Sequence, residues 1–229
     1  MATERNKKLN KLKNKILYKY LPSKYVNDFI NKGEILFRNL TYFNNCEYNK
    51  RIGDIGDGGL RHNPINGFDV WNTTQATVIK LKDSFAYINT DNIFAFCVSE
   101  KLDKELFKEF DCDCCIEITN PAEFTKRIGR SLRYKYFDFD NIKYYNTSDN
   151  LQHLINKPET IPFYKTIDYE SQNEYRYLFS ESKIKLEILF STLPLTDEQI
   201  LELKTHEKED KLVIGSLTDI AKPRFFHEL

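Results

Sequence analysis

The segment with the clearest chemical pattern is Gln172-Asn-Glu-Tyr-Arg176. We predict a strand here, and because side chains alternate between the two faces of a strand, Gln172, Glu174 and Arg176 share one face. A carboxylate on an otherwise apolar strand has two uses. It pairs with a neighbouring cation such as Arg176, which offsets its desolvation, or it binds a ribose hydroxyl or a developing positive charge at the bottom of a cleft. The sequence leaves both uses open.

A second candidate is the segment from Asn44 to Trp71, which loses periodicity and concentrates Gly, Asp, Asn and Pro. Backbone N–H groups freed by glycine, together with Asp54 and Asp57, are what a phosphate or a calcium ion requires. The run has neither the D-x-D-x-D-G order of an EF-hand nor the G-K-S/T end of a P-loop. We expect a long mobile loop without strands, and a ligand-binding loop is the alternative.

Three of the five cysteines lie close together, at Cys112, Cys114 and Cys115. A zinc site normally needs a second ligand pair at a defined distance, whereas the other two cysteines are isolated and the histidines form no H-x-x-x-H pair. The alternation of residues 113–119 instead predicts a buried strand, with Cys115 facing one way and Cys114 the other. We expect no metal, and a zinc site is the alternative.

Residues 1–15 form a strongly basic segment in which Leu9, Leu12 and then Ile16 recur at helical spacing. This pattern predicts an amphipathic helix with a lysine face. The simpler interpretation is a solvated helix that packs on the domain. The alternative is contact with a nucleic acid or an acidic partner through the lysines.

The predicted elements place these segments in one α+β domain, residues 16–229, in which a mixed β-sheet is flanked by helices. Proline and glycine punctuate the elements, for example Pro22 before a helix and Gly33 after it. We predict strands at 16–20, 34–37, 92–98, 113–119, 141–145, 162–167, 174–179, 185–190 and 211–214, and helices at 22–30, 101–110, from 121, and 196–207.

Composition narrows the classes of protein to consider. The chain has 229 residues, a formal net charge of +0, 17 Phe and 14 Tyr but 8 Gly, which indicates one aromatic-rich globular domain and argues against disorder. Because the basic and acidic residues balance, the net charge of the chain provides no strong long-range attraction for polyanions such as nucleic acids. Because no apolar run approaches the roughly 20 residues of a membrane span and none follows the charged start, we expect a cytoplasmic protein without a membrane partner.

Several segments, taken in order, resemble an uncharacterised bacterial family whose members carry Y-K-[YF], L-x-F, C-I-x-F, F-x-K and E-x-E-[WY]-R. The matching segments are Leu17-Tyr-Lys-Tyr20, Glu34-Ile-Leu-Phe37, Cys115-Ile-Glu117, Phe163-Tyr-Lys165 and Glu174-Tyr-Arg176. The chain departs from that family at Asn44-Asn-Cys-Glu47, where the family has N-D-P-x-E, and at Gln172, where it often has Glu.

A more distant resemblance is to ADP-ribosyltransferases, whose NAD cleft is built from a split β-sheet and which carry Q-x-E or E-x-E on a late strand. Gln172-Asn-Glu174 matches that motif. The resemblance implies that Glu174 holds the nicotinamide ribose and stabilises an oxocarbenium-like transition state, while Gln172 orients the acceptor. Further candidates for contact with NAD are Tyr18, Tyr20, Arg38, Ser99, Arg176, Asp54 and Asp57.

Two functions follow from these patterns. One is an ADP-ribosyltransferase-like enzyme that uses NAD as substrate, transferring ADP-ribose to a macromolecule or hydrolysing NAD, in a bacterial stress or phage-defence setting. The other is a non-catalytic module that binds a nucleotide or a protein, in which Glu174 pairs with Arg176 for structure alone.

Overall fold

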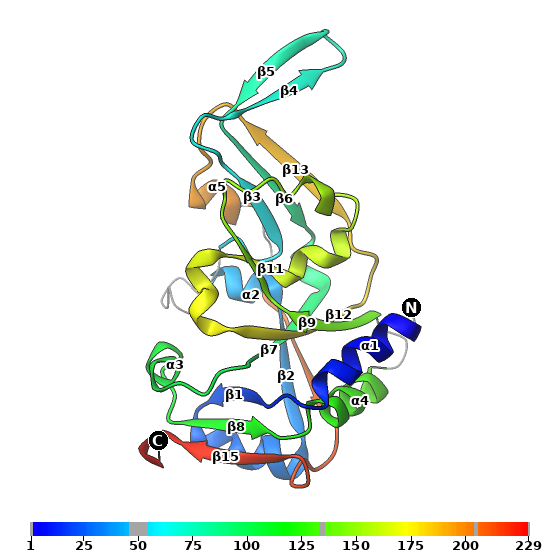
Figure 1. The fold of residues 1–229 in the computed structure, drawn as a ribbon, viewed down its shortest axis with the longest axis vertical. Coiled ribbons are helices and arrows are strands. Elements are labelled where there is room, and N and C mark those ends of the chain that lie inside the picture. Colours follow the sequence, from blue (N-terminus) through cyan, green and yellow to red (C-terminus); the bar gives the residue numbers. More distant parts are fainter. Residues whose placement is uncertain (1, 46–54, 133–135, 204–205, 229) are drawn as a thin grey trace.

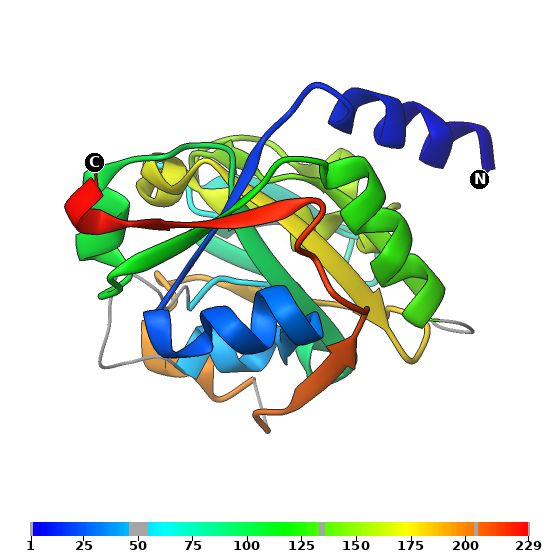
Figure 2. The same cartoon turned by 90° about the horizontal axis from the view of Figure 1, so that it is seen from below.

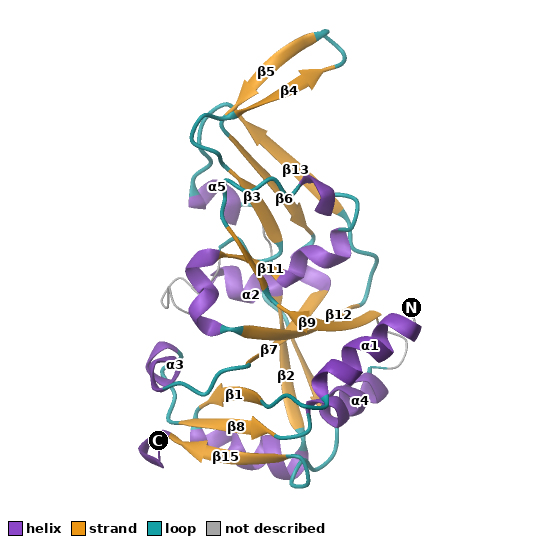
Figure 3. Ribbon diagram, viewed as in Figure 1, coloured by secondary structure: helices purple, strands orange, loops and turns teal. Residues whose placement is uncertain are grey.

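A computed structural model describes residues 2–45, 55–132, 136–203 and 206–228. It confirms the α+β fold class, because the chain contains both helices and strands, and most of the strand pairings are antiparallel (Figures 1 and 3). The α-helices are α1 (Ala2–Leu12), α2 (Leu40–Asn45), α3 (Lys104–Glu109), α4 (Pro121–Ser131) and α5 (Asp197–Leu201). Ser23–Tyr25 and Asp28–Lys32 form further helical turns after β1.

The main sheet contains eight strands, and within the described residues all their pairings are antiparallel. They are β1 (Leu17–Leu21), β2 (Glu34–Asn39), β7 (Ile93–Ser99), β8 (Cys114–Ile118), β9 (Tyr136–Asn141), β12 (Glu174–Ser180), β14 (Glu209–Val213) and β15 (Ala221–Phe225).

Strand β7 is the central strand of this sheet, because it pairs with three other strands. Strand β12 pairs along its whole length on one edge, where Glu174 lies opposite Ser99. On the other edge, β2 pairs with Phe94 and Ala95, while β1 pairs with Ser99 alone. Strands β1 and β2 therefore diverge, and the sheet is split between them, as Figure 1 shows.

The smaller sheets lie beyond the main one (Figure 1). Strands β3 (Gly59–His62), β6 (Asp83–Ile88) and β13 (Leu186–Ser191) form an antiparallel sheet, and β10 (Lys143–Tyr145) pairs in parallel with β11 (Tyr164–Thr166). Strands β4 (Phe68–Asn72) and β5 (Thr77–Leu81) form a hairpin that projects from one end of the molecule. On this hairpin Trp71 lies opposite Val78 and is 60% exposed.

Aromatic side chains fill the core against the main sheet. Phe37, Phe96 and Tyr177 are all buried, and Phe124 and Ile128 of α4 pack against the same cluster. Helix α4 begins where the sequence predicts, because the Asn120 side chain accepts a hydrogen bond from the N–H of Glu123 and Pro121 occupies the first turn. The apolar face of the amphipathic helix α4 thus packs on one face of the sheet.

Gly33 ends the helical turns before β2, as predicted. Its φ of 67° lies in the left-handed region, and a Cβ added there would come within 1.9 Å of the Gly215 carbonyl oxygen. Both constraints require glycine at this position. The turn leads directly into β2, one of the two strands between which the sheet splits.

Some expectations were wrong. The segment 44–71 is not a strandless loop, because it contains β3 and the start of the β4–β5 hairpin, although residues 46–54 lie outside the described part of the chain. Helix α2 and strands β5, β6, β9 and β15 were not predicted, and α5 ends at Leu201 rather than near 207. No helix among the described residues is long and apolar enough to cross a membrane.

Candidate functional site

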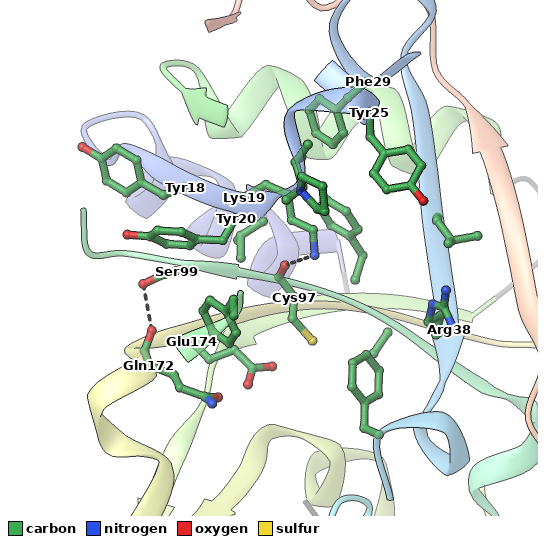
Figure 4. Close-up of a pocket in the computed structure, with 18 of the residues that line it drawn as sticks. Tyr18, Lys19, Tyr20, Tyr25, Phe29, Arg38, Cys97, Ser99, Gln172 and Glu174 are labelled. Atoms are coloured by element: carbon green, nitrogen blue, oxygen red, sulfur yellow. Dashed lines mark hydrogen bonds between the residues drawn. The ribbon is translucent and has the colours of Figure 1, made fainter. Parts of the chain in front are cut away.

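A pocket of about 440 Å³ lies where β1 and β2 diverge from β7 (Figure 4). Residues from β1, the turns at 23–32, β2 and β7 line it, together with Lys165, Gln172 and Glu174. Aromatic rings contribute much of its wall, and the charged residues of the lining include Lys19, Arg38, Lys165 and Glu174. The remaining charged groups of the lining are Asp28, Glu34 and Lys211; Glu34 pairs with Lys211, and Asp28 with Lys32.

Glu174 is the first residue of β12, and its side chain is 6% exposed at the pocket wall. Its Oε1 accepts a hydrogen bond from Arg176 Nε at 2.7 Å, and its Oε2 lies 2.9 Å from Lys165 Nζ. Burial alone raises the pKa of a carboxyl, but Arg176 and Lys165 overcome this and hold the pKa of Glu174 well below its ordinary value. Glu174 is therefore ionised at neutral pH.

Arg176 lies behind Glu174 and is fully buried. Its Nη1 and Nη2 atoms bind the two carboxylate oxygens of Asp57 at 2.7 and 2.9 Å, and Nη1 also donates to the Pro162 carbonyl at 2.7 Å. Burial works against the charged guanidinium, yet Asp57 and Glu174 raise the pKa of Arg176. Neither Arg176 nor Asp57 is among the residues that line the pocket, so both act on it through Glu174.

The backbone around Glu174 is fixed by its neighbours. Asn173 adopts a left-handed conformation with φ of 42°, which asparagine tolerates better than most residues. Ser99 Oγ donates to the Gln172 carbonyl at 2.7 Å, and the N–H of Glu174 donates to the Tyr144 hydroxyl at 2.9 Å. Figure 4 shows the Ser99 contact on the same side of the pocket as the Glu174 carboxylate. Ser99 therefore positions the turn that carries Glu174.

Alternation placed Gln172 on the same strand as Glu174, and this prediction was wrong. Gln172 is the last residue of the helical turn Ile167–Gln172. Its side chain still lines the pocket. The amide Nε2 donates to Glu109 Oε1 at 2.9 Å, and Oε1 accepts from Lys165 Nζ at 3.5 Å. Gln172 thereby links α3 to the wall formed by Lys165 and Glu174.

Lys19 of β1 binds the backbone of Cys97 on β7. Lys19 Nζ donates to the Cys97 carbonyl at 2.9 Å and lies 4.6 Å from the centre of the Phe96 ring. Burial lowers the pKa of Lys19. Burial, followed by the charge of Glu174, raises the pKa of the Cys97 thiol to about 12, so this cysteine is protonated at neutral pH.

Arg38 lies on β2, where alternation turns Ile35 and Phe37 into the core and leaves Arg38 facing the pocket. Its guanidinium lies 3.9 Å from the centre of the Tyr42 ring, and its contact with Glu209 is long, at 3.8 Å. Stacked on an aromatic ring and partly exposed, Arg38 keeps donors available for an anion.

Tyr18 and Tyr20 both line the pocket from β1. The Tyr20 hydroxyl donates to the Lys101 carbonyl at 2.8 Å and accepts from the N–H of Asp103 at 2.9 Å, so it anchors the start of α3. Burial, and then the charge of Glu117, raises the pKa of Tyr18. Tyr18 is register-paired with Ser99, which is in turn paired with Glu174, so β1, β7 and β12 bring these three residues into one row.

The cysteine-rich segment is the buried strand β8, as predicted. Cys114 faces the main core, while Cys115 packs with Tyr20 and Phe107 on the other face. Burial raises the pKa of Cys115 to about 12 and that of Cys114 to about 11. Across the residues that the structure describes, there is no group of three or more His, Cys, Asp or Glu side chains arranged to hold a metal.

The structure gathers six of the predicted site residues in one pocket: Tyr18, Tyr20, Arg38, Ser99, Gln172 and Glu174. It places Arg176 and Asp57 behind them, and Asp54 lies outside the described residues. Sequence reasoning missed Lys19 and Lys165 as site residues. Both stand within the segments that carry the family resemblance, at the centre of Leu17-Tyr-Lys-Tyr20 and at the end of Phe163-Tyr-Lys165, which was the available signal.

Comparison with known proteins finds no match to the chain among family models, curated proteins or solved structures. The fold and the residues of the pocket are therefore the basis for any assignment of function.

Proposed function

We propose that this protein binds NAD in the pocket between β1 and β2 and cleaves its nicotinamide–ribose bond, passing ADP-ribose to a macromolecule or to water. The observation that carries the proposal is the buried, ionised carboxylate of Glu174, which reaches the pocket wall in a split sheet. A fixed carboxylate at such a position is suited to a ribose hydroxyl and to a cation that develops during bond cleavage.

The size and lining of the pocket support a nucleotide ligand. Its volume of about 440 Å³ lies in the range of small-molecule sites. Tyr18, Tyr20 and Phe110 offer aromatic surface for a planar ring, and Lys19 and Arg38 offer donors for phosphate oxygens. These cations stand apart from Glu174, so that phosphate and ribose have separate partners.

In the proposed reaction, the bond between ribose C1′ and the nicotinamide nitrogen breaks and its electron pair leaves with nicotinamide. Glu174 accepts a hydrogen bond from a ribose hydroxyl and stabilises the positive charge that appears at C1′. An acceptor oxygen or nitrogen then bonds to C1′ and releases its proton. Gln172 lies beside Glu174 and is the group proposed to orient that acceptor.

The test is titration of the purified protein with NAD and with ADP-ribose, followed by an assay for released nicotinamide. The variant Glu174→Gln keeps the shape of the side chain, and we expect it to lose about 10²-fold or more in the rate of release. Glu100→Gln is a matched control because Glu100 pairs with Lys15 and is not a lining residue. Equal rates for wild type and Glu174→Gln would refute the proposed role.

A second candidate is a module that binds a nucleotide without cleaving it. One observation favours it: both oxygens of Glu174 already have cationic partners, Arg176 and Lys165. These partners reduce the charge that a developing cation would experience. Saturable binding of NAD and ADP-ribose with no release of nicotinamide would select this candidate. In either case we propose a cytoplasmic setting, supported by the four described cysteines being free.

A further inference from the structure

We propose that α1 and α4 together form a basic surface that binds the phosphate backbone of a nucleic acid. Five exposed cationic side chains define this surface, which we name the α1–α4 surface: Lys7, Lys11, Lys13, Lys126 and Arg130. The proposal is independent of the NAD pocket, because no residue of the α1–α4 surface lines that pocket.

The two helices are in contact and lie on the same side of the molecule (Figures 1 and 2). Arg5 of α1 reaches across to α4 and β9: its guanidinium lies 5.3 Å from the centre of the Phe137 ring. A Cβ placed on Gly129 of α4 would come within 2.5 Å of Arg5 Nη2. The absence of a side chain at Gly129 therefore lets α1 approach α4, and their lysines and arginine contribute to one surface.

Three carboxylates near these helices, those of Asp138, Asp140 and Asp219, are paired with inner basic residues. Lys8 binds Asp138 at 2.9 Å and Asp140 at 3.1 Å, and Arg127 binds Asp219 through two nitrogens. These pairs hold the helices to the domain. They also engage these three carboxylates, which leaves them less available to the outer lysines.

The outer basic residues keep their charge for a partner. Within the described residues, no carboxylate lies at ion-pair distance from Lys7, Lys11 or Lys13, and Lys126 and Arg130 share Glu123 at 3.9 and 3.4 Å. Lys7 and Lys11 are four residues apart in α1, so they lie on one face about 6 Å apart along the helix axis. At this spacing the two lysines are suited to contact neighbouring phosphates of one nucleic-acid strand.

The burial of α1 favours a nucleic acid over an anionic membrane. A helix that lies on a bilayer needs a free apolar face to insert among the lipids. In α1 that face is occupied, because Leu12 is 1% exposed and Leu9 packs against the main core. Ile16, beyond the end of the helix, is 43% exposed and adds little apolar area by itself. The accessible part of α1 is therefore charged and polar, which suits phosphates in solution.

The experiment measures binding of the full chain to a fluorescein-labelled duplex DNA and to a single-stranded RNA, each of about 20 nucleotides per strand, between 50 and 200 mM salt. We expect binding that is independent of sequence, falls as salt rises, and has a Kd of about 10⁻⁴ to 10⁻⁶ M near physiological salt. The double variant Lys7→Gln/Lys11→Gln should weaken binding about tenfold or more at the lowest salt. It should also reduce the slope of log affinity against log salt by about 1 to 2.

The matched control is Lys183→Gln/Lys185→Gln, which changes the net charge equally at exposed lysines between β12 and β13. Its binding should equal that of wild type, and circular dichroism should show that both double variants are folded. The proposal fails if wild type does not bind at 50 mM salt, or if both double variants lose affinity equally. It also fails if the chain binds vesicles of phosphatidylserine and not the nucleic acids.

Discussion

Lys165 and Glu174 form a buried ion pair, with Nζ and Oε2 2.9 Å apart and the two side chains 3% and 6% exposed. Arg176 and Asp57 extend this pair into a network of two cations and two carboxylates. Only the Lys165–Glu174 end of the network meets the pocket. A ligand that binds Glu174 must therefore compete with Lys165, while the Arg176–Asp57 end keeps the carboxylate in place.

Replacing Lys165 should destabilise the protein. Lys165→Met leaves Oε2 of Glu174 without its cation in a buried setting, and breaking a buried pair in this way costs about 3 to 5 kcal/mol in free energy of unfolding. Because Arg176 still holds Oε1, we expect the lower end of that range. Urea denaturation followed by circular dichroism measures the change, with the exposed Lys80→Met as control.

The double variant Lys165→Met/Glu174→Gln measures how strongly the two side chains stabilise each other. With both charges removed, no uncompensated charge remains at this end of the network, so the double variant should be more stable than Lys165→Met. Strictly additive losses in the two single variants would show that the two side chains are not coupled.

Asp57→Asn should have a comparable effect from the other end of the network. The substitution removes one of the two anions that balance the fully buried Arg176, and we expect a loss of about 3 to 5 kcal/mol in free energy of unfolding. Asp69→Asn, at an exposed position on the hairpin, is the matched control and should change stability little. Wild-type stability in Asp57→Asn would mean that Glu174 and the Pro162 carbonyl suffice for Arg176.

Acid should weaken the fold partly through Glu174. Its pKa in the folded state lies well below the ordinary value of 4.5, so the folded state binds this proton less readily than the unfolded state. The resulting stabilisation is fully present above pH 4.5 and is lost as the pH falls towards the folded-state pKa. Comparison of wild type with Glu174→Gln between pH 7 and pH 2 should show a shallower loss of stability in the variant below pH 4.5. Parallel curves would contradict this assignment.

Lys19 should react early with amine-directed reagents. Burial lowers the pKa of Lys19, so a larger fraction of it is the neutral, nucleophilic amine at pH 8 to 9 than its ordinary pKa would give. Lys108, which is exposed on α3, is the residue for comparison. Mass spectrometry after brief acylation should find Lys19 modified before Lys108. NAD or ADP-ribose bound in the pocket should protect Lys19 and leave Lys108 unchanged. Slower modification of Lys19 without ligand would show that the pocket does not admit the reagent.

Several strands of the split sheet were the easiest elements to predict. Strands β1, β7, β8 and β12 were predicted within one or two residues, because their largely buried positions give short apolar and aromatic runs in the sequence. Strand β15 was missed because Pro223 lies inside it, and a proline there normally argues against a strand. As an edge strand, β15 tolerates the missing N–H. The hairpin strands were hidden by the turn-forming residues around them.

Site residues that stand out in their own sequence motif could be predicted. Site residues that are defined by contacts between distant segments of the chain could not. Glu174 stands out in its own motif. Lys165 and Lys19 become site residues only through contacts with Glu174 and Cys97, and sequence spacing does not encode such long-range pairing. Gln172 was assigned to the strand because alternation cannot anticipate the left-handed residue at Asn173.

Trp71 is the single tryptophan of the chain, and it lies on the projecting hairpin, 60% exposed. Its indole is already hydrated in the folded protein, so intrinsic tryptophan emission should change little when the main sheet unfolds or when the pocket fills. The same emission is a local probe. A blue shift or a loss of quenching by iodide on mixing with another macromolecule would mark contact at the hairpin, far along the chain and in space from β12.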